Sequence, residues 1–357
     1  MSDWGRVQAL LDAGAAGGVA PHIALLAWRD GANAASLAAG QATPETVFDL
    51  ASLTKPLATA VIALSLDISG RLPWATSLEE IMGSPPVPPD KAGITIVQLL
   101  AHAAGYPAHR PYHEALERQP RPARPGLLMA MLMNEPLVSA PGSRALYSDL
   151  DYLLLGLILA RAADRDLPRA LAQVYNSLGV KDGPAFRPPN PAPADLAPSN
   201  LANVAPCDAL PGRPLIHGSV EDENAFALGG AAGHAGLFGS AAQVAAVMDA
   251  LCRCLHGGGP WPAEAVAKLF ALDAATPGSG HTPGFDTPSG PDSAAGNNAP
   301  AGTVGHLGFT GVSLWWQPRA NSGLVLLTNR VALGRDNSKI KAFRREIHEA
   351  AWPLLGY

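Results

Sequence analysis

The spacing of apolar residues at the N-terminal end of the chain predicts a helix followed by a β-hairpin. Residues 7–11 place valine and leucine side chains at helical spacing. Residues 22–28 form an apolar, extended run, an Asp-Gly turn follows at residues 30–31, and a weaker strand extends to Ala39. Two strand-like runs joined by a short turn of this kind are typical of a hairpin.

Residues 53–68 form a long apolar run. Alanine, leucine and isoleucine occupy nearly every side of this helix-forming stretch, which ends at Gly70. A helix that is apolar all round is buried in the protein. We therefore expect a central core helix, whose first turn carries a lysine, Lys55.

The middle of the chain, from residue 72 to about residue 219, alternates helical segments with proline-rich connectors. Thr95 and Gln98 have the spacing of a capping box, and Ser148 precedes the apolar run 150–160. Strand-like alternation of apolar and polar residues is scarce here. This part is expected to be mostly helical.

The C-terminal part returns to strands. Residues 241–255 have the spacing of a helix, and residues 276–302 are rich in proline, glycine and serine, which is typical of a flexible loop or an irregular edge. Residues 312–316 and 324–327 flank a turn and predict a second hairpin. A closing helix is expected over residues 339–355.

Strands at both ends of the chain and helices in its middle indicate an α+β fold. We expect one antiparallel sheet, built from the N- and C-terminal strands and flanked by helices, in a lobe formed by residues 1–71 and 229–357. Residues 72–228 would form a second, mostly helical lobe. Because enzyme sites commonly lie between packed lobes, the active site is expected at their boundary.

The composition narrows the classes of partner and location. Of the 357 residues, 48% are hydrophobic and 15% are charged, and the formal net charge is -5, so the chain lacks the basic excess that nucleic-acid binding needs. Three cysteines argue against a disulfide framework and favour a reducing compartment, so a cytoplasmic location is expected. The N-terminal residues predict neither a signal-peptide core nor a membrane span.

Two residues at the start of the apolar helix carry groups suited to nucleophilic catalysis. Ser52 and Lys55 are separated by about one helical turn, so their side chains lie on the same face. A serine hydroxyl becomes nucleophilic when a neighbouring base takes its proton, and burial lowers the pKa of a lysine toward the range where it can do so. Lys55 is therefore expected to activate Ser52, helped by the helix N-terminus.

Two further motifs accompany this pair. Residues 147–149 are Tyr-Ser-Asp, and residues 306–308 are His-Leu-Gly within the glycine-rich segment 305–311. A Ser-x-x-Lys motif, a Tyr-x-Asn-like triplet and a Lys-Thr-Gly-like triplet, in this order, resemble the signature of serine β-lactamases and penicillin-binding proteins. Their order and spacing are similar to those of class C β-lactamases and the related family VIII-type carboxylesterases. The similarity covers nearly the whole chain, from about residue 19 to residue 337.

The resemblance implies a β-lactamase/DD-peptidase-like fold and roles for the matching residues. It makes Ser52 the nucleophile, with Lys55 and Tyr147 as the acid-base groups. It also implies an oxyanion hole formed by the backbone N–H groups of Ser52 and Phe309. The substrate-binding residues would be Asp149, His306, Gly308 and Phe309.

Two of the motifs depart from the family pattern. Asp149 stands where many relatives carry asparagine, and as an anion it would stabilise the charged form of Lys55. His306 and Leu307 replace the usual lysine and hydroxyl residue, which weakens the anchor for a β-lactam carboxylate. We therefore expect an ester or amide substrate without an obligatory carboxylate beside the scissile bond, and weak β-lactam turnover.

Other chemistries find less support in the sequence. His102, His217 and His234 could each pair with a serine, but no Gly-x-Ser-x-Gly elbow accompanies them. A Cys-x-Cys pair followed by a histidine, within residues 252–256, matches no common zinc spacing. We expect no metal and no organic cofactor.

The sequence thus predicts a serine hydrolase that acts through an acyl-enzyme on a small ester, amide or peptide substrate, with no nucleic-acid partner and no membrane span. A β-lactamase, or a D-alanyl carboxypeptidase or aminopeptidase acting on peptidoglycan fragments, is the alternative that the same residues could serve. A binding or scaffold protein that has kept the fold without catalysis is the alternative from another class. The oligomeric state is left open.

Overall fold

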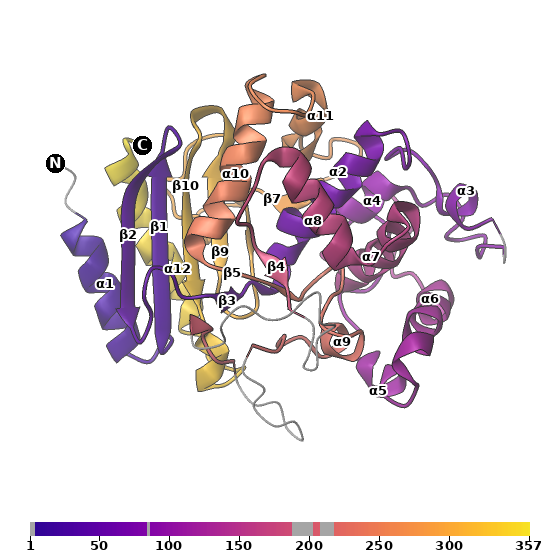
Figure 1. Cartoon of the computed structure of the whole chain (residues 1–357), viewed down its shortest axis with the longest axis horizontal. Coiled ribbons are helices and arrows are strands. Elements are labelled where there is room, and N and C mark those ends of the chain that lie inside the picture. The colour runs from indigo at the N-terminus through magenta and orange to yellow at the C-terminus, as the bar shows by residue number, and fades with distance from the viewer. Residues whose placement is uncertain (1–3, 84–85, 188–202, 208–217) are drawn as a thin grey trace.

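Strands from the two ends of the chain pair in one antiparallel sheet. The computed structural model describes residues 4–83, 86–187, 203–207 and 218–357, and within them seven strands form this sheet in the order β2-β1-β10-β9-β8-β7-β6 (Figure 1). The first and last strands of the chain are neighbours, with Leu25 of β1 opposite Leu326 of β10. The expected α+β fold is confirmed. The strands are β1 (His22–Arg29), β2 (Ala32–Gly40), β6 (His281–Thr282), β7 (Phe285–Asp286), β8 (Val304–Leu307), β9 (Ser313–Gln317) and β10 (Ser322–Thr328).

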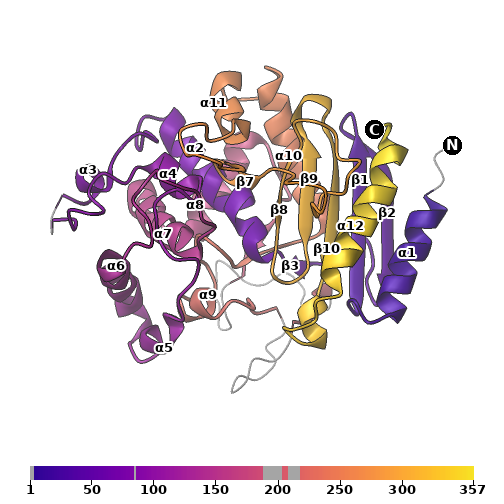
Figure 2. The ribbon, with the colours of Figure 1, turned by 180° about the vertical axis from the view of Figure 1, so that it is seen from behind.

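Helices cover both faces of this sheet. α1 (Gly5–Ala16) and α12 (Ile340–Ala351) lie on one face and α10 (Ala241–Leu255) on the other, as the two opposite views show (Figures 1 and 2). Successive residues of β1 belong to different layers: Ile23 is buried with side chains of α1 and α12, and Ala24 is buried in the cluster that includes α10. Because both faces are covered, β1 is apolar at nearly every position.

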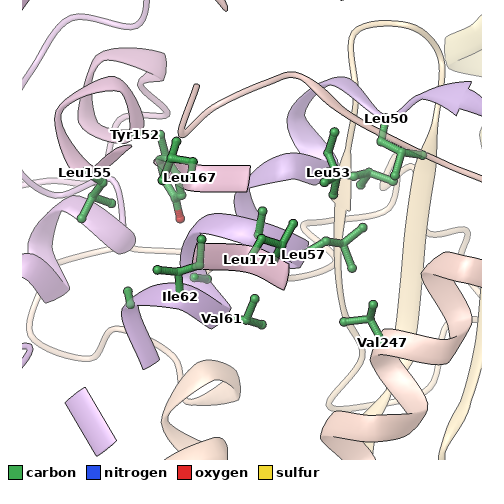
Figure 3. Close-up of a cluster of buried hydrophobic side chains, with 14 of the residues drawn as sticks. Leu50, Leu53, Leu57, Val61, Ile62, Tyr152, Leu155, Leu167, Leu171 and Val247 are labelled. Carbon is green, nitrogen blue, oxygen red and sulfur yellow. The ribbon is translucent and has the colours of Figure 1, made fainter. Parts of the chain in front are cut away.

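The remaining helices gather beside the sheet around the apolar run 51–68. Leu53, Leu57 and Val61 of that run lie in one buried cluster with Tyr152 and Leu171 (Figure 3). A smaller sheet of β3 (Phe48–Asp49), β5 (Leu237–Gly239) and β4 (Ala185–Phe186) lies between these helices and the large sheet (Figure 1). The helices are α3 (Leu78–Met82), α4 (Ile96–Leu100), α5 (His113–Leu116), α6 (Arg124–Asn134), α7 (Asp149–Ala163), α8 (Leu167–Leu178), α9 (Glu223–Ala227) and α11 (Ala263–Ala267). The lobe boundaries at residues 71 and 229 stay predictions.

The apolar run is not a uniform α-helix. It begins with a 3-10 turn (Ala51–Leu53), continues as a π-helix (Lys55–Ala60) and ends as α2 (Val61–Ile68). Pro56 lies in the first turn of the π segment, directly after the 3-10 turn, and it has no N–H to donate to the turn before it. Among the described residues, only this run is apolar and long enough to cross a membrane, and 78% of it is buried inside the protein, as in a core helix.

The polar stretch 276–302 supplies the edge of the large sheet. β6 and β7 lie within it and pair with each other, and Asp286 of β7 pairs with Gly305 of β8. The expectation of a flexible loop is wrong for these residues, and the alternative of an irregular edge is confirmed. Strands of two residues are too short to show the alternation from which strands are predicted.

Candidate active site

Ser52 lies on a tight turn directly after β3. Ala51 has a φ of 45°, in the left-handed region that non-glycine residues rarely adopt. The Asp49 carboxylate accepts hydrogen bonds from the backbone N–H groups of Ala51 and Glu221, both at 2.8 Å. Burial raises the pKa of Asp49 to about 7 in spite of these two bonds. A buried side chain that the sequence did not single out thus holds the strained turn that presents Ser52.

Lys55, Ser52 and Tyr147 form a closed triangle of polar atoms. Lys55 Nζ donates to Ser52 Oγ at 2.9 Å and to Tyr147 Oη at 2.7 Å, and Tyr147 Oη donates to Ser52 Oγ at 2.8 Å. Lys55 Nζ also donates to Asp149 Oδ1 at 2.8 Å. All three protons of the ammonium group are therefore engaged. The fold brings together four of the residues that the sequence singled out, from two distant segments.

The positive charge of Lys55 is stabilised by Asp149. Burial by itself lowers the pKa of the fully buried Lys55, but Asp149 and Tyr147 together outweigh burial, and the net pKa is raised. Burial also opposes ionisation of Asp149, yet Lys55 and His109 more than compensate and hold the pKa of this carboxyl well below its usual range. The prediction that burial lowers the pKa of Lys55 is therefore wrong for the net effect, and the expectation that Asp149 stabilises the charged lysine is confirmed.

His102 packs against Tyr147 and accepts a hydrogen bond from the backbone next to it. The backbone N–H of Ser148, the N-cap of α7, donates to His102 Nδ1 at 3.1 Å. The ring centroids of His102 and Tyr147 are 4.7 Å apart. Burial raises the pKa of Tyr147 to about 12, although the neighbouring Lys55 opposes this effect. The phenol is therefore protonated in the resting site and hydrogen-bonded to both Ser52 and Lys55.

No described histidine serves as the direct partner of Ser52. His102 accepts a backbone hydrogen bond, and His234 Nε2 contacts Asp222 Oδ1 at 2.8 Å. His217 lies outside the described residues. Among the described residues, the groups that hydrogen-bond to the Ser52 hydroxyl are those of the triangle.

His306 offers a neutral side chain where many relatives carry a cation. It is buried in β8, and its Nδ1–H donates to the Leu307 carbonyl at 2.7 Å. Burial lowers the pKa of His306, and the nearby Asp286 opposes this shift only in part. Position 306 therefore carries no positive charge at neutral pH.

Only glycine fits at position 308. A Cβ atom there would lie 2.4 Å from Val312 Cγ2 and 3.0 Å from the Leu50 carbonyl oxygen. Contacts this short are not tolerated in a packed interior without a shift of the backbone. Gly308 therefore allows the end of β8 to approach the turn that carries Ser52.

Phe309 follows at the mouth of the site. Its side chain is 47% exposed, and the guanidinium carbons of Arg330 and Arg335 lie 4.7 Å and 5.2 Å from its ring centroid. In the part of the chain that the structure describes, the backbone N–H groups of Ser52 and Phe309 donate no hydrogen bond to protein atoms. Two such free N–H groups are what an oxyanion hole requires.

Two cavities meet at Ser52. Their volumes are about 910 Å³ and about 410 Å³, and Ser52, Asp149, Phe309 and Arg335 line both. A nucleophile at this junction has space on either side for the acyl group and the leaving group of a substrate. The larger cavity is also lined by His281, Asp286, His306 and Arg344, and the smaller one by Asp49, Glu221, Asp222 and Glu223.

No metal site accompanies this arrangement in the described ranges, where no three His, Cys, Asp or Glu side chains converge. Cys252 and Cys254 are free and buried. The expectation that catalysis needs no cofactor stays a prediction.

Comparison with known proteins identifies the family that the three motifs resemble. The family model described as Beta-lactamase matches residues 7–349. A protein of Escherichia coli O157:H7 named "Putative D-alanyl-D-alanine carboxypeptidase" is 32% identical over 321 residues, which cover 81% of this chain and 70% of the relative. A protein of the same name from Escherichia coli strain K12 is 31% identical over 320 residues, with the same shares covered.

Solved structures share the fold. The crystal structure of SurE has a TM-score of 0.71 at 24% identity and covers 99% of this chain and 76% of its own. EstCE1, described as a hydrolase with promiscuous acyltransferase activity, has a TM-score of 0.70 at 23% identity and covers 98% of both chains. Since the family model spans nearly the whole chain and a relative is 32% identical over most of both lengths, this protein belongs to the beta-lactamase family of serine hydrolases.

Proposed function

We propose that this protein hydrolyses carboxylic esters through an acyl-enzyme formed on Ser52, with Lys55 and Tyr147 as the acid-base groups. The observation that carries the proposal is the triangle of Ser52, Lys55 and Tyr147, whose polar atoms lie within 2.9 Å of one another where two cavities meet. A hydroxyl with two such neighbours meets the geometric requirement for an activated nucleophile.

The raised pKa of Lys55 favours Tyr147 as the group that transfers the proton. In the reactive form Tyr147 is a phenolate beside the Lys55 ammonium group, and it takes the proton of Ser52 as Oγ bonds to the carbonyl carbon. The resulting phenol then protonates the alkoxide of the leaving alcohol. In the second half of the reaction, the Tyr147 phenolate takes a proton from a water molecule, and the resulting hydroxide attacks the acyl-enzyme. The Tyr147 phenol then returns the proton to Ser52 Oγ as the carboxylic acid departs.

The energetic cost of the phenolate is compatible with turnover. With the pKa of Tyr147 at about 12, ionisation at pH 7 costs on the order of 7 kcal/mol. A turnover of about 10 per second corresponds to a total barrier of roughly 16 kcal/mol. The ionisation step therefore fits within the barrier of an ordinary enzyme, and Lys55 contributes by stabilising the phenolate.

The third motif favours esters over carboxylate-bearing β-lactams. Neutral His306 and apolar Leu307 provide neither the charge nor the hydroxyl that would hold a carboxylate next to the scissile bond. The fold likeness to EstCE1, a hydrolase by its description, is in line with this choice.

The proposal is tested by hydrolysis of short-chain p-nitrophenyl esters beside nitrocefin. We expect ester turnover with little nitrocefin cleavage, a loss of at least about 10³-fold in Ser52→Ala, and a loss of about 10²–10⁴-fold in Tyr147→Phe. Tyr357→Phe, at the exposed C-terminus, is the matched control and should keep full activity. Activity that survives Ser52→Ala would show that Ser52 is not the nucleophile.

A second candidate is a D-alanyl carboxypeptidase, which the names of the 32% and 31% identical relatives favour. If the enzyme is cytoplasmic, as the sequence predicts, its substrates would be peptidoglycan fragments rather than the cell wall. Release of D-alanine from an acylated D-Ala-D-Ala peptide, faster than ester hydrolysis, would favour this candidate. A protein without catalysis would instead fail to react with a fluorophosphonate probe.

A further inference from the structure

Arg344 of α12 is a buried cation bonded to carbonyl oxygens. Its side chain is 7% exposed, and no ion pair links it to a carboxylate in the described part of the chain. Nη2 donates to the carbonyl oxygens of Gly308 at 2.6 Å and Val312 at 2.7 Å, and Nε donates to that of Gly311 at 3.1 Å. The three acceptors belong to the last residue of the third motif and to the loop that follows it.

The bond to Gly308 sets the direction of a particular N–H group. In a trans peptide unit the C=O and the following N–H point in opposite directions. The carbonyl of Gly308 points to Arg344, so the N–H of Phe309, in the same peptide unit, points the other way. Val312 keeps the neighbouring peptide in place, since its carbonyl accepts from the Gly308 N–H at 2.8 Å.

A second arginine supports the same loop. Arg330 Nε donates to the Phe309 carbonyl at 2.8 Å. The carbonyl groups on both sides of Phe309 are thus tied to guanidinium groups, and among the described residues its N–H donates no turn or loop hydrogen bond. A positive charge at the carbonyl end of a peptide unit also polarises its N–H, which makes that group a stronger donor to an anion.

The cost of burying the charge of Arg344 supports the same role for its three hydrogen bonds. Burial lowers the pKa of Arg344 to about 9, with Arg330 adding to the shift, so the side chain is still charged at neutral pH. A buried cation without a carboxylate is costly and is retained only where several strong acceptors receive it. The three carbonyl bonds fill that requirement.

We propose that Arg344 is a positioning residue that fixes and polarises the Phe309 N–H for binding the oxyanion of the tetrahedral intermediate. The proposal rests on the proposed function, in which Phe309 and Ser52 supply the oxyanion hole. Arg344 acts through the Gly308–Phe309 peptide and not by touching the reacting atoms.

The test compares Arg344→Lys and Arg344→Met with the wild type. The readouts are kcat and KM for an uncharged and an anionic p-nitrophenyl ester and the rate of fluorophosphonate labelling. A further readout is the inhibition constant of an alkylboronic acid, whose tetrahedral adduct with Ser52 places an oxygen in the hole. We expect kcat to fall about 10–100-fold in Arg344→Met, somewhat less than for direct loss of an oxyanion donor. KM should change less than about twofold, and the boronate inhibition constant should rise in parallel with the fall in kcat.

The controls separate positioning from folding. Arg344→Lys keeps a cation in the loop and should restore part of the rate. Arg345→Met removes the next arginine of the same helix, which pairs with Asp292 at the surface, and should behave as wild type. Thermal midpoints of unfolding identify any variant that does not fold. If Arg344→Met does not fold, the reduced kcat expected of the folded Arg344→Lys protein is the test.

Three outcomes would overturn the inference. They are wild-type kcat and labelling rate in folded Arg344→Met, or in folded Arg344→Lys where the methionine variant does not fold; a fall in kcat without weaker boronate binding; and a raised KM confined to anionic esters. The last result would make Arg344, which lines the larger cavity, a substrate-binding residue. If the wild type hydrolyses no ester, the proposed function fails, and the labelling rates of the variants still test the role of Arg344.

Discussion

Asp149 determines the charge of Lys55, the buried lysine beside Ser52. An asparagine at this position would accept the same hydrogen bond from Lys55 without adding a negative charge. The carboxylate, 2.8 Å from Lys55 Nζ, turns a buried lysine that burial would neutralise into an ammonium group. In the proposed mechanism Tyr147 therefore carries the acid-base role.

Replacing Asp149 with asparagine tests this assignment. We expect the pKa of Lys55 to fall in Asp149→Asn, because burial is no longer opposed by the anion. If the Lys55 charge is needed, kcat/KM of the variant will decline on the alkaline side at a lower pH than in the wild type. The measurement is the pH profile of ester hydrolysis from pH 6 to pH 10 for both proteins.

An increase in activity with pH in place of the decline would refute the mechanism. If neutral Lys55 were the base, the kcat/KM of Asp149→Asn would rise with pH in a range where the kcat/KM of the wild type is still low. Asp90→Asn, which removes the carboxylate partner of another buried lysine, Lys91, is the matched control and should leave the profile unchanged.

At the residue scale the sequence singled out the groups of the triangle but not the roles of their supports, since Asp49 was not noticed and His102 was considered only as a partner of a serine. Ser52, Lys55 and Tyr147 could be found because each belongs to a short motif with fixed spacing. Asp49 and His102 act by hydrogen bonds to the backbone of Ala51 and Ser148. No spacing in the sequence shows that such side chains reach those N–H groups.

Elements that depend on local signals were predicted well. Both hairpins, α10 and the N-cap Ser148 are confirmed, and the capping box of Thr95 and Gln98 is present on both sides. Caps, turns and helical spacing involve residues a few positions apart, so the sequence contains all the partners. The π segment after Ser52 and the two-residue strands β6 and β7 have no comparable local signal.

The helix α7 depends on a close approach between Gly156 and Gly233, where neither residue has room for a side chain. A Cβ atom at Gly156 would lie 2.8 Å from the backbone nitrogen of Gly233 and 3.1 Å from its Cα. This contact joins α7 to Gly233, which directly precedes His234. The carbonyl oxygen of His234 lies 3.4 Å from Lys55 Nζ. The packing of the helix is therefore coupled to the site.

Gly156→Ala is expected to destabilise the protein by about 1–3 kcal/mol, because backbone atoms cannot yield to the added methyl group. Helix propensity alone would stabilise the variant by about 1 kcal/mol, so the sign of the change tests the contact. The measurement is the free energy of unfolding in urea.

The control is Gly126→Ala in α6, where an added Cβ meets nothing within 4 Å. This variant should be as stable as the wild type or slightly more stable. If both alanine variants stabilised the protein, the close packing of α7 against Gly233 would be refuted.

At the scale of the whole molecule, α12 connects the C-terminus of the chain to the sheet and to the segment before β8. His348 is fully buried there: its Nδ1–H donates to the Ala294 carbonyl at 2.6 Å, and Nε2 lies 3.3 Å from Ser313 Oγ of β9. Burial lowers the pKa of His348 to about 4 from a reference of 6.5. The folded protein therefore requires the neutral ring.

This requirement predicts a loss of stability in mild acid. Between pH 6.5 and pH 4 the unfolded chain binds a proton at His348 that the folded protein does not, so the contribution to stability is complete above pH 6.5 and falls as the pH falls. His348→Gln should remove about 2 kcal/mol of the stability difference between pH 7 and pH 5. The measurement is urea unfolding at the two pH values.

The exposed His256 provides the comparison. His256→Gln should keep the pH dependence of the wild type, since this side chain lies at the exposed end of α10. Equal pH dependence in wild type and His348→Gln would contradict the role given to burial.

The sequence by itself determined the α+β class, the local elements, the order of the three motifs and hence the family, since these depend on residue types and short spacings. It also indicated, through Asp149, that the charged form of Lys55 is favoured. Only the tertiary structure decided the outcome of opposing effects: burial lowers the pKa of Lys55, and a carboxylate 94 positions later reverses it. The same holds for Arg344, 36 positions after Gly308. Such terms depend on distances and burial, which exist only once the chain has folded.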